Sequence, residues 1–338
     1  MSRIFKSQII QKDDSIDATQ LYSDAEKWIE EEKSRKGVDR LHRWHPLQHL
    51  LNSSSGTYVS PTAMKSFEGC PAGYIYSKLV KEKTGTATSV GSTVHTIFDR
   101  FYKLPGDERT TEAIYSLMDQ VIKEDDQEES RNDVKFYVDG YMESLDYTTG
   151  RPMDHSKLMC STETFIKPII NPLGVDLGVP VYVLIDRIDV RNDGIYVIDY
   201  KTGAGDPNPY LLGENGYLPQ MIFYTWAVEA EYGERPKKTM LCLPGASMEY
   251  KYVDMNVHSL VEQSKVVEKV KHHIEHARSC RDSLQFEESI MRYCGSCQMK
   301  YMCKTWLKYK NLDLSQAKDV IDIEIEIEDQ YGDGRCCG

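Results

Sequence analysis

The stretch VPVYVLIDRIDVRNDGIYVIDYKTG, residues 179–203, predicts the centre of the fold. It holds two runs of β-branched, aromatic and other apolar residues, separated by the turn-forming letters RNDG. Two such runs around a short polar turn are a typical β-hairpin signal. We therefore expect an antiparallel pair of strands joined by a two-residue turn at Asp193 and Gly194.

Three ionisable side chains of this hairpin are expected on one face. The turn pairs Asp186 with Lys201 and Asp199 with Ile188, and side chains alternate between faces, so both acids and the lysine converge. Burying unpaired carboxylates costs free energy, so something must compensate their charge. A divalent cation with oxygen ligands is the favoured partner, and an Asp–Lys ion pair on an exposed strand is the alternative.

The segments that follow or precede the hairpin predict further strands and helices. Residues 160–170 have the composition of a strand, and residues 218–233 that of a helix. Residues 239–245 predict another strand, and residues 257–280 predict a long helix. The second half of the chain is therefore expected to hold a sheet with helices between its strands.

Two helices are expected upstream. Ser60 is a good N-cap and Pro61 a good first helical residue, so a helix should begin there, end near Gly69 and place Cys70 at its end. A second helix, SVGSTVHTIFDRFYKL (89–104), has an apolar face. Its apolar residues are Val94, Ile97, Phe98 and Phe101.

Three cysteines lie close together in YCGSCQMKYMC, residues 293–303. Cys294 and Cys297 have the C-x2-C spacing, and Cys303 follows. The chain has nine cysteines without the spacing of a disulfide framework, so in a reducing compartment this group predicts metal or cluster binding, or redox chemistry. Such sites normally need a fourth ligand, which must come from elsewhere in the chain.

The charge of the chain is unevenly distributed. Its net charge of −12 argues weakly against nucleic-acid binding. However, residues 289–312 contain no acid and interleave basic with aromatic side chains, among them Lys300, Lys304 and Trp306. This composition suits a nucleic-acid backbone and stacked bases, and an ordinary solvated helix is the alternative.

The organisation of the chain is expected to be one domain with additions. Residues 1–56 resemble a charged helical appendage, and residues 311–338 form an acidic tail. The polar N-terminus and the absence of a long apolar run predict a soluble intracellular protein without a membrane association.

Motifs in a fixed order resemble the PD-(D/E)XK nuclease superfamily, in particular its RecB-like exonuclease branch. GSTVHTIFD resembles the Gly-x-x-x-His motif of that branch, LIDRID its second motif, VIDYKTG its acid-x-lysine motif and QMIFY its following helix. The residues that carry the resemblance are His95, Glu163, Asp186, Asp199-Tyr200-Lys201, Gln220 and Tyr224.

The resemblance implies a fold and an organisation of domains. The fold is a restriction-endonuclease-like α/β core, a central mixed β-sheet flanked by helices, with helical additions and an iron–sulfur cluster domain. The nuclease domain covers residues 57–310, includes a helical insertion at 104–159 and carries cluster ligands at both ends.

The resemblance also supplies the fourth cysteine. In CRISPR-associated and AddB-like relatives, one upstream cysteine joins three downstream ones around a [4Fe-4S] cluster. The matching residues here are Cys70, Cys294, Cys297 and Cys303. Four thiolates at this spacing also permit structural zinc, which remains an alternative.

Each site residue has a role implied by the resemblance. Asp186 and Asp199 bind Mg2+ or Mn2+, and Lys201 orients the nucleophile or stabilises the transition state. His95 is a further metal ligand, and a core histidine hydrogen-bonded to a carbonyl is the alternative. Glu163 holds a second metal or a metal-bound water, or is a plain surface glutamate. Gln220 and Tyr224 are expected to contact DNA, with simple helix–sheet packing as the alternative. The basic-aromatic segment adds three expected DNA contacts: Lys300, Lys304 and Trp306.

The implied function is that of a metal-dependent DNA exonuclease, acting on single strands or ends in repair, recombination, or viral or CRISPR DNA processing. Its expected partner is DNA, with a separate helicase or recombination protein and a homo-oligomer as further candidates. The expected location is the cytoplasm, that of the host if the protein is viral. The alternative is a non-catalytic iron–sulfur or zinc subunit that binds DNA within a larger complex.

Overall fold

The computed structural model describes residues 58–74, 86–203, 205–283, 287–289, 294, 297 and 303. These residues belong to two compact units, which we treat separately. The sheet unit comprises the described residues between Lys83 and Lys269, and the cysteine unit comprises those before and after. The expected appendage (1–56) and acidic tail (311–338) lie outside the described residues. None of the described helices combines the length and apolarity needed to cross a membrane.

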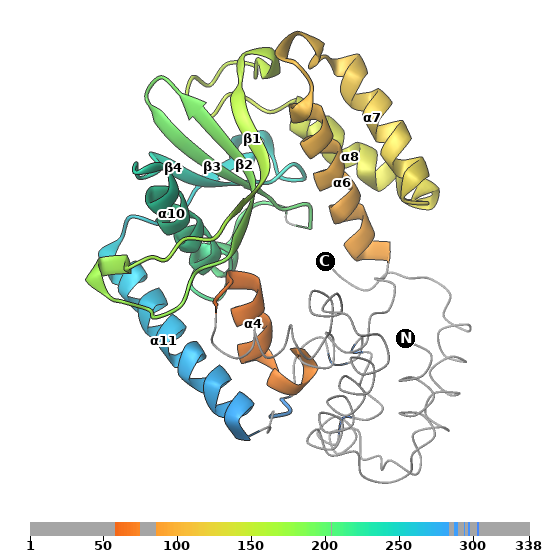
Figure 1. The fold of residues 1–338 in the computed structure, drawn as a ribbon. Helices are drawn as coiled ribbons and strands as arrows, with labels where there is room; N and C mark the ends of the chain where they lie inside the picture. The colour runs from red at the N-terminus through yellow and green to blue at the C-terminus, as the bar shows by residue number, and fades with distance from the viewer. Residues whose placement is uncertain are drawn as a thin grey trace, which may run out of the picture. The chain divides into compact units, whose positions relative to one another are not determined.

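A five-stranded sheet forms the centre of the sheet unit (Figure 1). Its order is β1-β2-β3-β4-β5, with β3 and β4 parallel and the other neighbours antiparallel. This arrangement confirms the expected mixed sheet flanked by helices. The strands are β1 (Met159–Ile166), β2 (Val183–Arg191), β3 (Gly194–Tyr200), β4 (Lys238–Cys242) and β5 (Tyr252–Asp254).

Helices lie before, between and after the strands. The α-helices are α4 (Pro61–Gly69), α6 (Thr86–Lys103), α7 (Thr111–Glu124), α8 (Arg131–Met142), α9 (Pro209–Leu212), α10 (Leu218–Tyr232) and α11 (Leu260–Ser283). The short 3-10 turns are η3 (Gly106–Glu108), η4 (Glu128–Ser130), η5 (His155–Lys157), η6 (Pro172–Gly174) and η7 (Met248–Tyr250).

The predicted hairpin is present, but its turn lies one residue earlier than predicted. Arg191 pairs with Gly194, so the turn is Asn192-Asp193 and not Asp193-Gly194. The Asp193 carboxylate is held in this turn by the Tyr196 hydroxyl, which donates to it at 2.9 Å. Moving a two-residue turn by one position changes each pairing by two residues, so the faces are preserved.

The corrected register changes the partner of the first acid. The last pair of the β2–β3 register is Arg187 with Ile198. Extending this register by one residue places Asp186 directly opposite Asp199, whereas Lys201 was the predicted partner. The acids and Lys201 still share a face, because the alternation of side chains is unchanged. The prediction of convergence is therefore right, and the predicted pairs are wrong.

Helices α6, α7 and α8 cover one face of the sheet (Figure 1). The predicted apolar face of α6 is fully buried there, at Val94, Ile97, Phe98 and Phe101. Ile114 and Val121 of α7 and Val138 of α8 belong to the same core as Tyr196 and Ile198 of β3. Helices α7 and α8 lie within residues 104–159, and their apolar sides form one wall of this core. That this segment is an insertion stays a prediction.

A buried ion pair lies between this helical layer and β2. The Arg187 Nε lies 3.0 Å from the Asp189 Oδ1, and neither side chain is exposed. The Arg187 Nη1 donates to three tyrosine hydroxyls, those of Tyr102, Tyr141 and Tyr200. Burial opposes the charge on Arg187, yet Asp189 and the tyrosines raise the pKa of the guanidinium above its usual value.

Helix α10 covers the opposite face of the sheet (Figure 1). It ends at Gly233, whose φ of 71° lies in the left-handed region that glycine adopts without strain. On its outer side, the Trp226 Nε1 donates to the Gln263 Oε1 of α11 at 3.1 Å. The predicted helix over residues 218–233 is thereby confirmed.

In the cysteine unit, α4 begins as predicted. The Ser60 Oγ accepts a hydrogen bond from the Ala63 N–H at 3.2 Å, Pro61 is the first helical residue, and Cys70 follows the last. The C-terminal part of α11 belongs to the same unit. The Ala72 N–H donates to the carbonyl of Glu287 at 3.0 Å, which joins the segment that follows α4 to the segment that follows α11.

We expect Asp189→Ala to lower the free energy of unfolding by about 3–5 kcal/mol, because it leaves the Arg187 charge buried without a counterion. The double variant Arg187→Met/Asp189→Ala should lose less, since it removes both charges. Urea unfolding followed by circular dichroism measures both. A double variant less stable than Asp189→Ala would contradict the proposed importance of this charge pair.

Candidate active site

Three acids lie in a row across neighbouring strands of the sheet. The pairing of β1 with β2 on both sides of Glu163 places this residue opposite Asp186. The pairing of β2 with β3 places Asp186 opposite Asp199. Like charges directly opposite one another destabilise a sheet, so this row needs compensation.

Glu163 has an unusual backbone conformation for a strand residue. Its φ is 45°, in the left-handed region that costs a residue other than glycine about 1–2 kcal/mol. Strained residues of this kind occur preferentially at functional sites. Burial raises the pKa of the Glu163 carboxyl, and the negative charge of Asp186 raises it further.

His95, Glu163 and Asp186 form a potential metal-binding group. One ligand atom from each lies within 4.8 Å of the others. Helix α6 supplies the histidine, β1 the glutamate and β2 the aspartate. The Tyr200 N–H donates to the Asp186 Oδ2 at 2.7 Å and so fixes the orientation of this carboxylate.

The hydrogen bonds of His95 indicate that this group fits a cation. Its Nε2 lies 3.1 Å from the Tyr200 carbonyl oxygen, which can only accept, so Nε2 carries the proton. In a neutral ring the Nδ1 then presents a lone pair to the Asp186 Oδ2, 3.6 Å away. Two acceptors that face each other need a proton or a metal ion between them.

The surroundings of His95 and Asp186 favour a proton between them when no metal is bound. Burial lowers the pKa of the His95 ring, but the neighbouring Asp186 carboxylate outweighs that effect and raises it. The same partnership lowers the pKa of Asp186 against the effect of its burial. A divalent cation would replace this proton and would also satisfy Glu163.

Asp199 is held by a different set of partners. Its Oδ1 accepts from the Gln220 Nε2 at 3.1 Å and from the Tyr224 hydroxyl at 3.3 Å. Its Oδ2 forms an ion pair with the Lys201 Nζ. Burial raises the pKa of Asp199, the charge of Lys201 opposes that rise, and Asp186 adds to it.

Lys201 is positioned by charge and by an aromatic ring. Its Nζ lies 4.8 Å from the centroid of the Tyr217 ring, and its side chain is 17% exposed. Burial lowers the pKa of the ammonium, but the neighbouring carboxylates Asp199 and Asp186 raise it, so Lys201 is a cation. The site therefore contains one fixed positive charge beside its acids.

Gly91 allows α6 to approach the segment that follows Lys201. A side chain at this position would place its Cβ 3.0 Å from the Thr202 Oγ1, which is closer than ordinary contacts. A larger residue here, four positions before His95, would require the Thr202 side chain to move. This contact gives a structural reason for the Gly-x-x-x-His pattern in this chain.

The structure brings most of the predicted site residues together. Glu163, Asp186 and His95 form the trio, with Asp199 and Lys201 beside it. Asp199 itself bonds to Lys201 and α10 and is not a member of the trio. Its role as a metal ligand stays a prediction.

The residues predicted to contact DNA divide into two groups. Gln220 and Tyr224 hydrogen-bond to Asp199 and to each other, and Tyr224 is only 3% exposed. The geometry therefore gives them the role of orienting Asp199, and DNA contact by them stays a prediction. The other predicted contacts, Lys300, Lys304 and Trp306, lie outside the described residues.

The four predicted cluster ligands lie in the cysteine unit. The Cys70 Sγ accepts from the Gly73 N–H at 3.3 Å and the Ser289 N–H at 3.5 Å. The Cys294 Sγ donates to the carbonyl of the same Ser289 at 3.7 Å. Thus Cys70 and Cys294 share a neighbour, although 224 positions separate them in the sequence.

Sequence reasoning missed two features of the site. No pattern in the sequence indicates the left-handed backbone of Glu163, because glutamate has no preference for it. The contact of Tyr217 with Lys201 depends on a loop of irregular structure between α9 and α10. The only sequence feature that could have indicated this contact is the position of Tyr217, immediately before the helix that carries Gln220.

The motifs described above lie within a region that matches a known protein family. The family model described as the PD-(D/E)XK nuclease superfamily matches residues 58–304, which is most of the chain. A search of curated proteins gives no match. The matched region contains every acid of the row, Lys201, and all four cysteines.

We expect Glu163→Gly to stabilise the metal-free protein by about 1 kcal/mol, because glycine adopts a φ of 45° without strain. Glu163→Gln removes the charge and keeps the strain, so it should stabilise less. Urea unfolding in the presence of a chelator measures both. Both variants should bind Mn2+ more weakly than the wild type, and a glycine variant less stable than the glutamine variant would refute the assignment of strain.

Proposed function

Because the chain belongs to the PD-(D/E)XK nuclease superfamily, we propose that it is a metal-dependent DNA exonuclease that acts on single strands or DNA ends. Membership of this superfamily supports a nuclease activity on DNA. The observation that carries the proposal is the row of acids, with a histidine lone pair turned toward it and a lysine at its end.

The residues present fit Mg2+ or Mn2+. Asp186, Glu163 and His95 would hold the ion, with Asp199 as a further ligand. Carboxylate oxygens suit both cations, and an imidazole nitrogen favours Mn2+ over Mg2+. A bound divalent cation supplies two things, neutralisation of charge on the scissile phosphate and acidification of water.

Lys201 contributes a positive charge that is already in place. Its contacts with Asp199 and the Tyr217 ring hold the ammonium near the acids. A charge that needs no reorientation stabilises the developing negative charge of phosphodiester cleavage most effectively. Lys201 is therefore the residue that stabilises the transition state or orients the nucleophile.

Gln220 and Tyr224 maintain the orientation of Asp199. Both donate to its Oδ1, so its Oδ2 remains directed at Lys201. The two residues lie four positions apart on α10, on one face of the helix. They act as positioning residues for the acid-x-lysine pair.

The branch and the pathway are part of the same proposal. Membership of the RecB-like exonuclease branch is supported by the order His95, Asp186, Asp199-x-Lys201 and Gln220. Repair, recombination, and viral or CRISPR DNA processing are the pathways that such an enzyme serves. A helicase or recombination protein would be a separate partner.

The proposal includes a [4Fe-4S] cluster bound by Cys70, Cys294, Cys297 and Cys303. Support comes from the N–H groups directed at the Cys70 Sγ, since hydrogen bonds to sulfur are typical around such clusters. A Cβ at Gly73 would lie 3.2 Å from this Sγ, so glycine leaves room beside it. Such a cluster would join the two ends of the nuclease domain.

Zinc at the same cysteines is supported less well. Bonds of 2.3 Å around a tetrahedral zinc ion require sulfur atoms about 3.8 Å apart. Within the part of the chain that the structure describes, the groups of three potential ligands within 4.8 Å contain no cysteine. The described cysteines form no disulfide.

We expect Asp199→Ala and Asp199→Asn to lower the rate of DNA cleavage on the order of a hundredfold or more. The measurement is digestion of single- and double-stranded DNA labelled at either end, with Mn2+ or Mg2+. Asp133→Ala is the matched control, because Asp133 is an exposed acid on α8. It should cleave DNA at the rate of the wild type.

The pattern of products decides the finer points. Progressive shortening from one end would support an exonuclease and reveal its polarity, whereas internal cuts would contradict it. DNA binding without cleavage in either metal would favour the alternative, a non-catalytic DNA-binding subunit. A non-catalytic subunit has no physical reason to keep the buried charges of Asp199 and Lys201 together, because burying charges costs free energy.

We expect the anaerobically purified chain to show broad visible absorption that Cys70→Ser abolishes. Cys160→Ser is the control, since Cys160 lies on β1 and outside the ligand set. A colourless wild type that contains zinc would refute the cluster and leave the nuclease proposal intact.

A further inference from the structure

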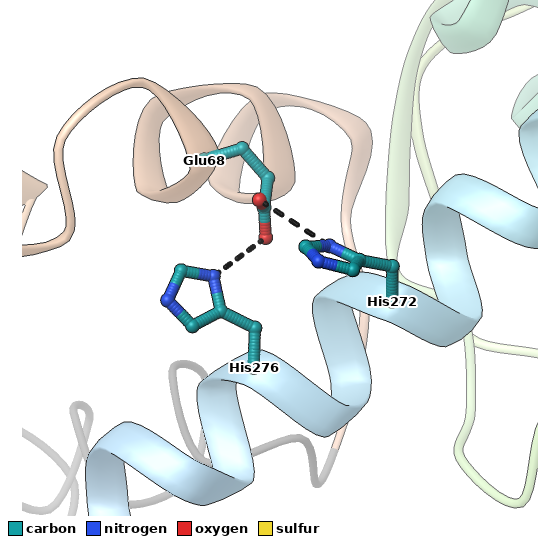
Figure 2. A group of neighbouring side chains, drawn as sticks. All are labelled: Glu68, His272 and His276. Carbon is teal, nitrogen blue, oxygen red and sulfur yellow. Dashed lines mark ion pairs between the residues drawn. The ribbon is translucent and has the colours of Figure 1, made fainter.

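A second group of potential metal ligands lies in the cysteine unit. It consists of Glu68 on α4 and of His272 and His276 on α11, and one ligand atom of each lies within 4.8 Å of the others. Figure 2 shows the carboxylate pointing between the two imidazole rings. None of these residues belongs to the active site or to the predicted cluster ligands.

The distances within this group suit a shared ion better than hydrogen bonds. The His272 Nδ1 lies 3.7 Å from the Glu68 Oε2, and the His276 Nδ1 lies 3.5 Å from the Glu68 Oε1. Both exceed the ordinary hydrogen-bond distance. Ligand atoms around a tetrahedral ion with bonds of 2.0–2.1 Å lie about 3.3 Å apart, so small rotations would complete the geometry.

The spacing of the histidines directs both rings to one side of α11. Residues four positions apart lie one above the other on a helix, and the two ring centroids are 5.8 Å apart. The Nδ1 of His276 is buried and has no hydrogen-bond partner within the described part of the chain. A buried nitrogen without a partner costs free energy, and a cation would satisfy it.

A third histidine holds the carboxylate in position. The His273 Nδ1 lies 2.9 Å from the Glu68 Oε1, and its side chain is 2% exposed. The Phe67 ring packs edge-on against both His273 and His276, with centroids 5.3 Å apart in each case. His273 thus fixes the orientation of the Glu68 carboxylate before any ion binds. Residues outside the ligand shell commonly orient metal ligands in this way.

We propose that Glu68, His272 and His276 bind Zn2+. Two imidazoles and one carboxylate form a ligand set that zinc uses, and Mg2+ prefers oxygen ligands throughout. A hydrogen-bonded cluster without metal accounts for His273 but not for the two longer pairs. The ion links the last turn of α4 to α11.

The consequence of this link concerns Cys70, which follows α4 by one residue. Zinc at Glu68 immobilises the end of the helix from which this cysteine projects. The site does not depend on the proposed nuclease activity, because its ligands are separate from His95, Glu163 and Asp186.

The test is competition for Zn2+ between the full chain and a chromophoric chelator. We compare the wild type with His272→Ala/His276→Ala, and use His258→Ala as a control at an exposed histidine outside the group. Because the cysteines and the active site are identical in all three, a difference isolates the new site. The double variant should bind one zinc fewer per chain, and the control should match the wild type.

Thermal unfolding supplies a second readout and a control for folding. In a chelator, wild type and double variant should unfold at nearly the same temperature. Added Zn2+ should raise the midpoint by several degrees in the wild type and less in the variant. Equal zinc stoichiometry and equal shifts would overturn the proposal.

A single variant keeps the test decisive if the double variant fails to fold. The His272 side chain is 72% exposed, so His272→Ala disturbs little packing. It should weaken zinc binding at least about tenfold, because even partners outside the ligand shell contribute about 10- to 100-fold. Unchanged affinity in this variant would equally overturn the proposal.

Discussion

The placement of Asp186 directly opposite Asp199 is the constraint on which the rest of the sheet unit depends. Two carboxylates at adjacent positions of neighbouring strands repel each other, and both are buried here. The surrounding elements each supply a compensating group. Helix α6 supplies His95, the end of β3 supplies Lys201, and α10 supplies hydrogen-bond donors.

Much of this arrangement follows from the periodicity of the sequence. Alternation in β2 and β3 predicted that Asp186, Asp199 and Lys201 share a face, and the capping residues predicted the start of α4. The position of the turn was not predictable, because Asn192, Asp193 and Gly194 all favour turns. Only the parity of the register matters for the faces, so this error left the site intact.

Other features depend on tertiary contacts that no local pattern encodes. The left-handed backbone of Glu163 belongs to a residue type that rarely adopts it. The burial of Arg187 contradicts the general rule that arginine is exposed. The nearby Asp189 supplies its counterion, and tyrosine hydroxyls from α6, α8 and β3 accept its hydrogen bonds. The zinc ligands proposed in α4 and α11 come from segments about 200 positions apart, so their proximity requires the folded chain.

The side chains of the neighbours Asp186 and Arg187 lie on opposite faces of β2. The aspartate faces the acids and α10, and the arginine faces the tyrosines beneath α6. Deletion or insertion of one codon in β2 between these residues and the turn at Asn192-Asp193 would exchange the two faces. It would move a guanidinium to the face that carries the row of acids, and an aspartate to the face with the buried tyrosine hydroxyls. Natural variation along β2 should therefore consist of substitutions, while changes in length accumulate in the loops around it.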